Sequence, residues 1–249
     1  MKMENPYNEK TQPWLDLRLT KKAIYHLWDD INNAKIKQID AKIHLAGNIS
    51  MSCWVEDKDN WFYENVLKEM MEYEWYKDWL NYYNVHVAKT FPHPTFELIE
   101  MWVNYQKQHE FNPPHTHHKG QGYSFVIFMK IPTHWKEQHA LPQSVLSTSP
   151  SASDFLFSVG VGRAQVNTIN IKLSPEDEGR MLFFPAWLQH QVLPFYGTEE
   201  QRITLSGNII PKTENLTNEV QLPMMKEELK QLEKEVKTLK ERIEERDKC

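Results

Sequence analysis

Histidines gather at one point of the chain, in the segment Asn112–His118, where His115, His117 and His118 follow two prolines. Because His115 and His117 stand two residues apart, both imidazoles lie on one face of an extended segment and can reach one centre. Imidazole is a ligand for iron, zinc, copper and nickel. The spacing therefore predicts a metal site, and the alternative is a histidine-rich surface turn that binds no metal.

A further histidine, His190, follows the apolar run Met181–Leu188 and its proline-containing turn. Beyond it, Arg202, Thr204 and Ser206 alternate with apolar residues, as is typical of a β-strand with one polar face. An arginine on an apolar sheet is costly unless an anionic partner lies beside it. A carboxylate ligand would satisfy the guanidinium group. The alternative is an ion pair with one of the chain's own acidic residues.

These motifs together resemble the iron- and 2-oxoglutarate-dependent oxygenase superfamily, and within it most of all the small oxygenases encoded by marine phages, including cyanophages. The resemblance covers roughly residues 91–212. It rests on the order His-x-His, a strand, a distal His and Arg-x-Thr-x-Ser, which is found here in the segments Phe111–His117, Tyr123–Phe128, Leu182–Val192 and Gln201–Asn208.

The resemblance implies a double-stranded β-helix, a jelly roll whose open mouth holds the metal. By this resemblance His115, His117 and His190 are the catalytic metal ligands and bind iron(II). Arg202 holds the distal carboxylate of 2-oxoglutarate, and Thr204 assists it. The implied activity is that of a dioxygenase, which we interpret as a hydroxylase. It converts 2-oxoglutarate and O2 to succinate and CO2 while oxidising a substrate that the sequence does not identify.

One position departs from the superfamily's usual pattern of two histidines and one carboxylate. Asp or Glu usually stands two residues after the first histidine, and here that residue is His117. A neutral third ligand leaves one more positive charge at the metal and matches ferrous chemistry less well. The alternative function is therefore a non-catalytic jelly roll, such as a binding or virion-assembly protein. A zinc hydrolase is less favoured, because no carboxylate stands beside the histidines as a general base.

The elements that must position these residues divide the chain into three blocks. Residues 1–90 are expected to form a helical support, with Thr20 capping one helix and a second helix over 61–80. Residues 91–212 are expected to form the jelly-roll core, and 138–153 a flexible insertion within it. The expected fold class is α+β with a mainly β core. Six runs rich in β-branched and aromatic residues are its predicted antiparallel strands: Phe96–Tyr105, Tyr123–Ile131, Phe155–Val159, Gln165–Leu173, Arg180–Phe184 and Arg202–Ile210.

The last block, residues 213–249, is expected to be a linker followed by a coiled-coil helix. Its apolar residues recur at alternating intervals of four and three, at Met225, Leu229, Leu232, Val236, Leu239 and Ile243. Valine and isoleucine at a, with leucine at d, favour a parallel two-stranded coiled coil and hence a homodimer. The alternative is a single helix packed on its own domain.

Composition excludes several other classes of protein. The chain of 249 residues, 40% hydrophobic and 25% charged, is typical of a globular protein. Its formal net charge of −5 gives no basic excess for nucleic-acid binding. No apolar run approaches the roughly 20 residues that span a bilayer. With two cysteines and no apolar leader, the protein is expected in the cytoplasm, that of the host if a phage encodes it.

Deleting residues 222–249 should convert a dimer into a monomer, because the apolar stripe of the predicted helix needs a covering surface. Light scattering measures the mass, and the metal content of the truncated protein should be unchanged. A truncated protein that stays dimeric would place the interface in the jelly roll. One that unfolds would show that the helix packs on its own domain.

Overall fold

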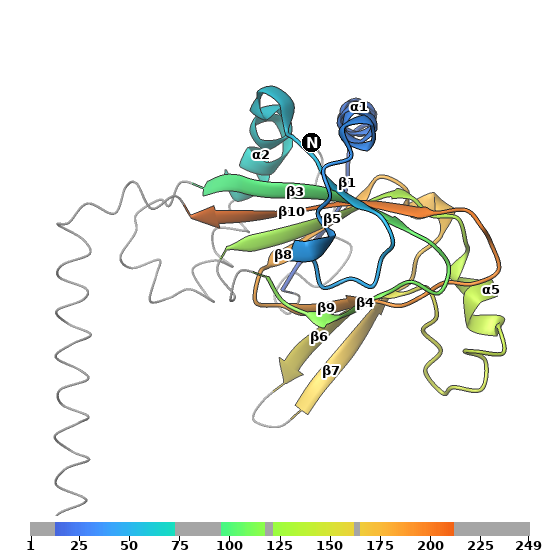
Figure 1. Ribbon diagram of the computed structural model, residues 1–249. Helices are drawn as coiled ribbons and strands as arrows, with labels where there is room; N and C mark the ends of the chain where they lie inside the picture. Colours follow the sequence, from blue (N-terminus) through green and yellow to red (C-terminus); the bar gives the residue numbers. More distant parts are fainter. Residues whose placement is uncertain (1–12, 73–95, 118–121, 162–164, 212–249) are drawn as a thin grey trace, which may run out of the picture. The chain divides into compact units, whose positions relative to one another are not determined.

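The computed structural model describes residues 13–72, 96–117, 122–161 and 165–211. These residues form two antiparallel sheets, one of six strands in the order β1-β8-β5-β10-β3-β2 and one of four in the order β4-β9-β6-β7. The two sheets lie as separate layers in Figure 1. The strands are β1 (Leu15–Arg18), β2 (Ser52–Trp54), β3 (Phe96–Gln106), β4 (Asn112–His115), β5 (Tyr123–Lys130), β6 (Phe155–Val161), β7 (Gln165–Ile171), β8 (Arg180–Pro185), β9 (Gln189–Val192) and β10 (Arg202–Pro211).

Successive strands of the core pass between the two sheets. From β3 onward, β3, β5, β8 and β10 belong to the six-stranded sheet, whereas β4, β6, β7 and β9 form the four-stranded one. This exchange between two antiparallel sheets is the jelly-roll arrangement, so the predicted mainly β fold is confirmed. All six predicted strands are present, and their ends agree with the prediction to within two residues.

The helix α1 (Lys21–Lys37) begins where the sequence predicts, because the Thr20 hydroxyl accepts a hydrogen bond from the Ala23 amide at 3.3 Å. In Figure 1, α1 and α2 (Lys68–Glu72) lie on the outer face of the six-stranded sheet. No described helix is both long and apolar enough to cross a membrane. The remaining helical segments are η1 (Lys42–His44), η2 (Lys58–Asn60), η3 (Tyr63–Leu67), α5 (Trp135–Ala140) and η5 (Pro175–Asp177).

The region expected to be a helical support also contributes two strands to the sheet. β1 pairs with β8 and β2 pairs with β3. Four and three residues are too few to give a recognisable alternation, so the sequence did not predict either strand. The boundary expected at residue 90, the end of the helix expected over 61–80 and the coiled coil at 213–249 lie outside the described residues.

The segment 138–153 differs from the flexible insertion that its composition predicts, because both of its ends are fixed. At one end, the buried Gln138 side chain donates to the Tyr196 carbonyl and accepts from the Tyr196 amide, both at 2.9 Å. At the other end, Ser153 and the adjacent Asp154 are fully buried. Only the turns between these ends are exposed, and they include Leu146.

The core lies between the two sheets and combines aromatic with aliphatic side chains. Trp14 stacks on Phe157 with ring centroids 4.5 Å apart, which joins the start of β1 to the four-stranded sheet. Aromatic pairs of this kind add stability beyond their buried area. The cluster comprises Trp14, Val126, Phe128, Ile131, Phe155, Phe157, Ile171, Leu173, Leu182, Phe184, Leu188 and Val192.

We expect Asp16→Ala to lower the free energy of unfolding by about 2–4 kcal/mol, because it removes one partner of a largely buried ion pair. Arg180 on β8 donates to both carboxylate oxygens of Asp16 on β1, at 2.8 and 2.6 Å. Urea denaturation measures the change. Glu200→Gln is the matched control, since it breaks the exposed Lys130–Glu200 pair and should cost less than about 1 kcal/mol. Equal losses in the two variants would contradict this account of the β1–β8 contact.

Candidate metal centre

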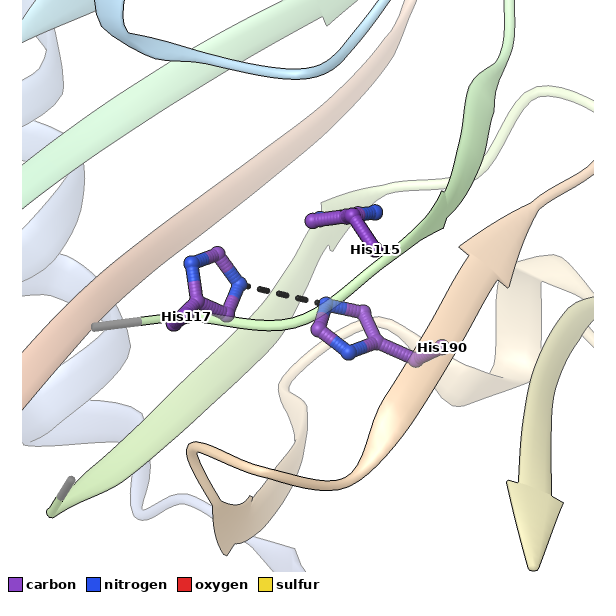
Figure 2. Close-up of side chains that lie close together, drawn as sticks. All are labelled: His115, His117 and His190. Atoms are coloured by element: carbon purple, nitrogen blue, oxygen red, sulfur yellow. Dashed lines mark hydrogen bonds between the residues drawn. The ribbon is translucent and has the colours of Figure 1, made fainter. Parts of the chain in front are cut away.

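The pairing of β4 with β9 brings two of the predicted histidines together. His115 lies directly opposite His190 in the register of these antiparallel strands. Side chains at such positions lie on the same face with Cβ atoms about 5 Å apart, and the two ring centroids are 4.3 Å apart. Residues far apart in the sequence therefore meet because of sheet register, as Figure 2 shows.

His117 completes the cluster from the segment that follows β4. Its backbone amide donates to the Ala186 carbonyl at 2.9 Å, which ties this segment to the turn before β9. Its ring lies 5.1 Å from His115 and 5.0 Å from His190, centroid to centroid. One nitrogen from each of the three histidines lies within 4.8 Å of the other two, so the group could hold a metal ion.

Hydrogen bonds to carbonyl groups fix the tautomers of two of these rings. His115 Nδ1 donates to the Pro113 carbonyl at 2.7 Å, and His190 Nδ1 donates to the Leu188 carbonyl at 3.0 Å. A carbonyl oxygen only accepts, so in both neutral rings the proton is on Nδ1 and the lone pair is on Nε2. Such outer contacts are the usual support of metal-binding histidines. Both rings are therefore prepared to bind a metal through Nε2.

The spacing of the nitrogens also fits a metal. His117 Nε2 lies 3.2 Å from His190 Nε2, and Figure 2 shows both atoms turned toward one another. Two nitrogens that each lie about 2.1 Å from one metal ion are about 3.0–3.4 Å apart. The cluster therefore fits a metal ion for two reasons. The three imidazoles are spaced as metal ligands are, and two of them have a lone pair on a defined nitrogen.

Burial keeps these rings in the uncharged form that binds metals. Desolvation lowers the pKa of His115, and it lowers the pKa of His190 still further, helped by the neighbouring His115 and His117. His190 is surrounded by aromatic rings, with Phe155 stacked at 5.6 Å and Phe184 edge-on at 4.7 Å. These rings also hold the His190 imidazole in one orientation.

The three histidines open onto a cavity of about 230 Å³ between the two sheets. Thr204 lines it together with Ser206 and Asn208, which follow at every second residue of β10. From the neighbouring strand β3, four residues at the same spacing also face it: Glu100, Trp102, Asn104 and Gln106. This alternation of polar residues is not predictive of a site by itself, because the strand also carries apolar residues such as Met101 and Val103.

Arg202 lies at the start of β10 and is fully buried. A register shift separates Ile203 from Thr204, and Arg202 is not one of the described residues that line the cavity. Its guanidinium group packs over the Phe195 ring at 5.1 Å. The sequence predicted that Arg202, Thr204 and Ser206 lie on one face of an alternating strand. For Arg202 this prediction does not hold, because the register shift interrupts the alternation.

The Arg202 guanidinium is only partly satisfied by hydrogen bonds. Nη2 donates to the carbonyl and the hydroxyl of Ser153, whereas Nε and Nη1 have no partner among the described residues. Burial lowers the pKa of Arg202 to about 10, and the nearby Asp154 carboxylate opposes this shift. The group therefore stays charged at neutral pH. A buried cation with free donors is a site for an anionic ligand.

The internal ion pair that the sequence left open as an alternative is not what the structure shows. The Asp154 carboxylate is bound by His139 at 2.9 Å and by Asn170 at 3.0 Å, and no described carboxylate pairs with Arg202 within 4.0 Å. Burial raises the pKa of Asp154, and these two hydrogen bonds oppose the rise. Asp154 thus balances the charge of Arg202 without occupying its donors.

One other described histidine of the same region does not belong to the cluster. His109 packs edge-on against Tyr196 at 5.1 Å, where its backbone has a positive φ of 69°. His118 lies outside the described residues. Ser153 and Asp154 were missed at the level of sequence, because the composition around them predicts an exposed loop and only tertiary contacts bring them to Arg202.

Part of the chain matches a family model. Residues 100–208 match a family model described as "Putative 2OG-Fe(II) oxygenase". The match spans β3 to β10 and includes all five predicted site residues: His115, His117, His190, Arg202 and Thr204. It supports the superfamily that the motifs indicated. No curated protein matches the chain.

Solved structures with similar folds include a prolyl-4-hydroxylase from Pseudomonas putida, with a TM-score of 0.47, 12% identity and coverage of 81% of this chain and 94% of that one. A 2OG-Fe(II) oxygenase family protein from Burkholderia pseudomallei has a TM-score of 0.43 and 10% identity, covering 83% and 92%. The epimerase SnoN from nogalamycin biosynthesis has a TM-score of 0.44 and 11% identity, covering 81% and 78%. Similarities at this level do not bear on substrate.

The matched family and the geometry of the cluster point to the same chemistry. The family uses iron(II) as cofactor and 2-oxoglutarate as co-substrate. The three imidazoles are ligands that could hold the metal. The β-core of this protein is therefore similar to the 2OG-Fe(II) oxygenases, an oxidoreductase class.

Proposed function

We propose that this protein is an iron(II)- and 2-oxoglutarate-dependent dioxygenase that hydroxylates its substrate. The observation that carries the proposal is that the fold contains both a candidate metal site and a candidate anion site. Three converging imidazoles, two with a fixed lone pair, lie at one end of β4 and β9. A buried arginine with free donors stands at the start of β10. A metal and an anionic co-substrate would use both.

In this proposal the residues of the chain hold and orient the reactants. His115, His117 and His190 hold the metal, and Arg202 binds the distal carboxylate of 2-oxoglutarate with Thr204 beside it. When bound, iron(II) supplies the redox chemistry that couples O2 and 2-oxoglutarate to oxidation of the substrate. Besides its polar residues, the cavity is lined by five apolar side chains: Phe125, Val126, Phe128, Phe155 and Phe184.

The proposal extends to the whole chain. Residues 1–90 support the core at 91–212, and residues 213–249 form a linker and a C-terminal coiled-coil helix that joins two copies into a dimer. We place the protein in the cytoplasm.

His115→Ala and His190→Ala should each abolish most iron(II) binding, because each removes one of three ligands. Elemental analysis of protein reconstituted anaerobically with one equivalent of iron(II) measures the effect. His109→Asn is the matched control, since this histidine lies outside the cluster and asparagine tolerates its positive φ. His117→Asp should retain the metal, because it restores the carboxylate common at this place. Full iron content in His115→Ala or His190→Ala would refute the site.

Arg202→Met should weaken 2-oxoglutarate binding by about 2–5 kcal/mol, roughly 30-fold or more, because it keeps the stem of the side chain and removes its charge. Arg202→Lys should fall between, since it keeps the charge but not the planar fork. Calorimetric titration of the iron-loaded protein gives the affinity, and succinate formation gives the turnover. Arg18→Met, at an exposed arginine that binds backbone carbonyls, is the control. A wild-type protein that binds no 2-oxoglutarate would favour the non-catalytic jelly roll.

A further inference from the structure

A second cluster of metal-binding side chains lies outside the cavity, between α1 and the helical segment that starts at Asp57. His26 and Asp30 stand one turn apart on α1, and each offers a ligand atom that lies within 4.8 Å of the other and of one from Asp57. None of these three residues lines the cavity that holds the other histidines. The oxygenase chemistry proposed above does not use them.

Two atoms of this cluster are buried without a hydrogen bond. His26 Nε2 and Asp30 Oδ2 have no hydrogen-bond partner among the described residues, and Asp30 is only 4% exposed. The two atoms lie 3.4 Å apart, at ion-pair range but beyond the usual 2.7–3.2 Å of an N–H···O bond. Two ligands that each lie about 2.1 Å from one tetrahedral metal ion are about 3.4 Å apart. The geometry thus suits a shared cation better than a hydrogen bond.

The other contacts of the cluster hold its side chains in place and leave lone pairs for a metal. The carboxylate of Asp57 accepts from the backbone amides of Phe62 at 2.7 Å and Tyr63 at 2.9 Å. Each carboxylate oxygen has a second lone pair for a metal. The ring of His26 stacks on Trp61, with centroids 4.0 Å apart, and this contact fixes the plane of its imidazole.

The charges around Asp30 favour a cation. Burial raises the pKa of Asp30 to about 6, with smaller contributions in the same direction from Asp57, Asp29 and Glu56, while His26 opposes the rise. The two carboxylates carry two negative charges, which a divalent ion balances. Since one ligand is an imidazole, a transition metal such as zinc suits the set better than magnesium or calcium.

We propose that His26, Asp30 and Asp57 form a second metal site, which takes a divalent transition metal of the zinc type. The ion joins α1 to the segment 57–72 on the outer side of the six-stranded sheet. Its role is structural, since it links two helical segments that also meet here through the Trp61 ring, which stacks on His26 and lies under Lys22 Nζ. Side-chain exposure of 27% at His26 leaves a path for the ion to enter.

The test uses the full-length protein with His115→Ala and His190→Ala, in which the first cluster is disabled. Titration with zinc(II) by calorimetry should give one equivalent bound, and cobalt(II) should bind there with an absorption spectrum of mixed nitrogen and oxygen ligands. Adding Asp30→Asn or His26→Gln should weaken zinc binding at least tenfold and remove the zinc-dependent rise in melting temperature. Asp57→Asn should also weaken zinc binding, because it removes one of the two carboxylates. Its amide oxygen can replace only one of the two carboxylate oxygens that accept from the Phe62 and Tyr63 amides.

Asp29→Asn is the matched control, because this neighbouring carboxylate is exposed and belongs to neither cluster. It should bind zinc as the background protein does. If the protein with His115→Ala and His190→Ala folds poorly, the test can use the wild type. The wild type should then bind two equivalents of zinc, and the single variant His26→Gln should bind one. A background protein that binds no zinc, or Asp30→Asn and His26→Gln variants that bind it undiminished, would overturn the second site. Neither result would bear on the oxygenase proposal, which the iron(II) and 2-oxoglutarate binding experiments test separately.

Discussion

The antiparallel pairing of β4 with β9 is the contact on which the metal centre depends. It sets His115 opposite His190, and a slip of one residue would turn one of these rings to the other face of the sheet. The other edge of β9 is fixed as well, because β9 also pairs with β6. In that pairing His190 lies opposite Phe157. The position of His117 follows from this pairing, since its amide binds the turn that leads into β9.

A second constraint is the burial of two opposite charges near one another. Arg202 and Asp154 are both fully buried, and each would be costly alone. Direct pairing would satisfy both groups and leave nothing for a ligand. Here His139 and Asn170 bind the carboxylate, and Ser153 takes one guanidinium nitrogen. The charge is therefore balanced at a distance, while two guanidinium nitrogens keep their capacity to bind an anion.

The sequence predicted the parts of the fold that have a strong local pattern. Six strands with long β-branched and aromatic runs were found, as were the capping role of Thr20 and the three converging histidines. The short strands β1 and β2 carry too few residues for a periodic signal. Ser153 was missed because its neighbours predict a loop, and its burial results from contacts with distant residues. The register shift beside Arg202 is likewise set by pairing with β5, which composition does not encode.

The histidine at position 117 can be understood from the surroundings of the cluster. Burial among Phe155, Phe184 and the other imidazoles keeps His190 uncharged before any metal arrives. A carboxylate at position 117, which is half-buried beside the His190 ring, would be partly desolvated in the metal-free protein. An imidazole avoids that cost, because it is neutral when unbound. The site with iron(II) then carries a net charge of +2 in place of +1, which strengthens its attraction for a doubly charged anion such as 2-oxoglutarate.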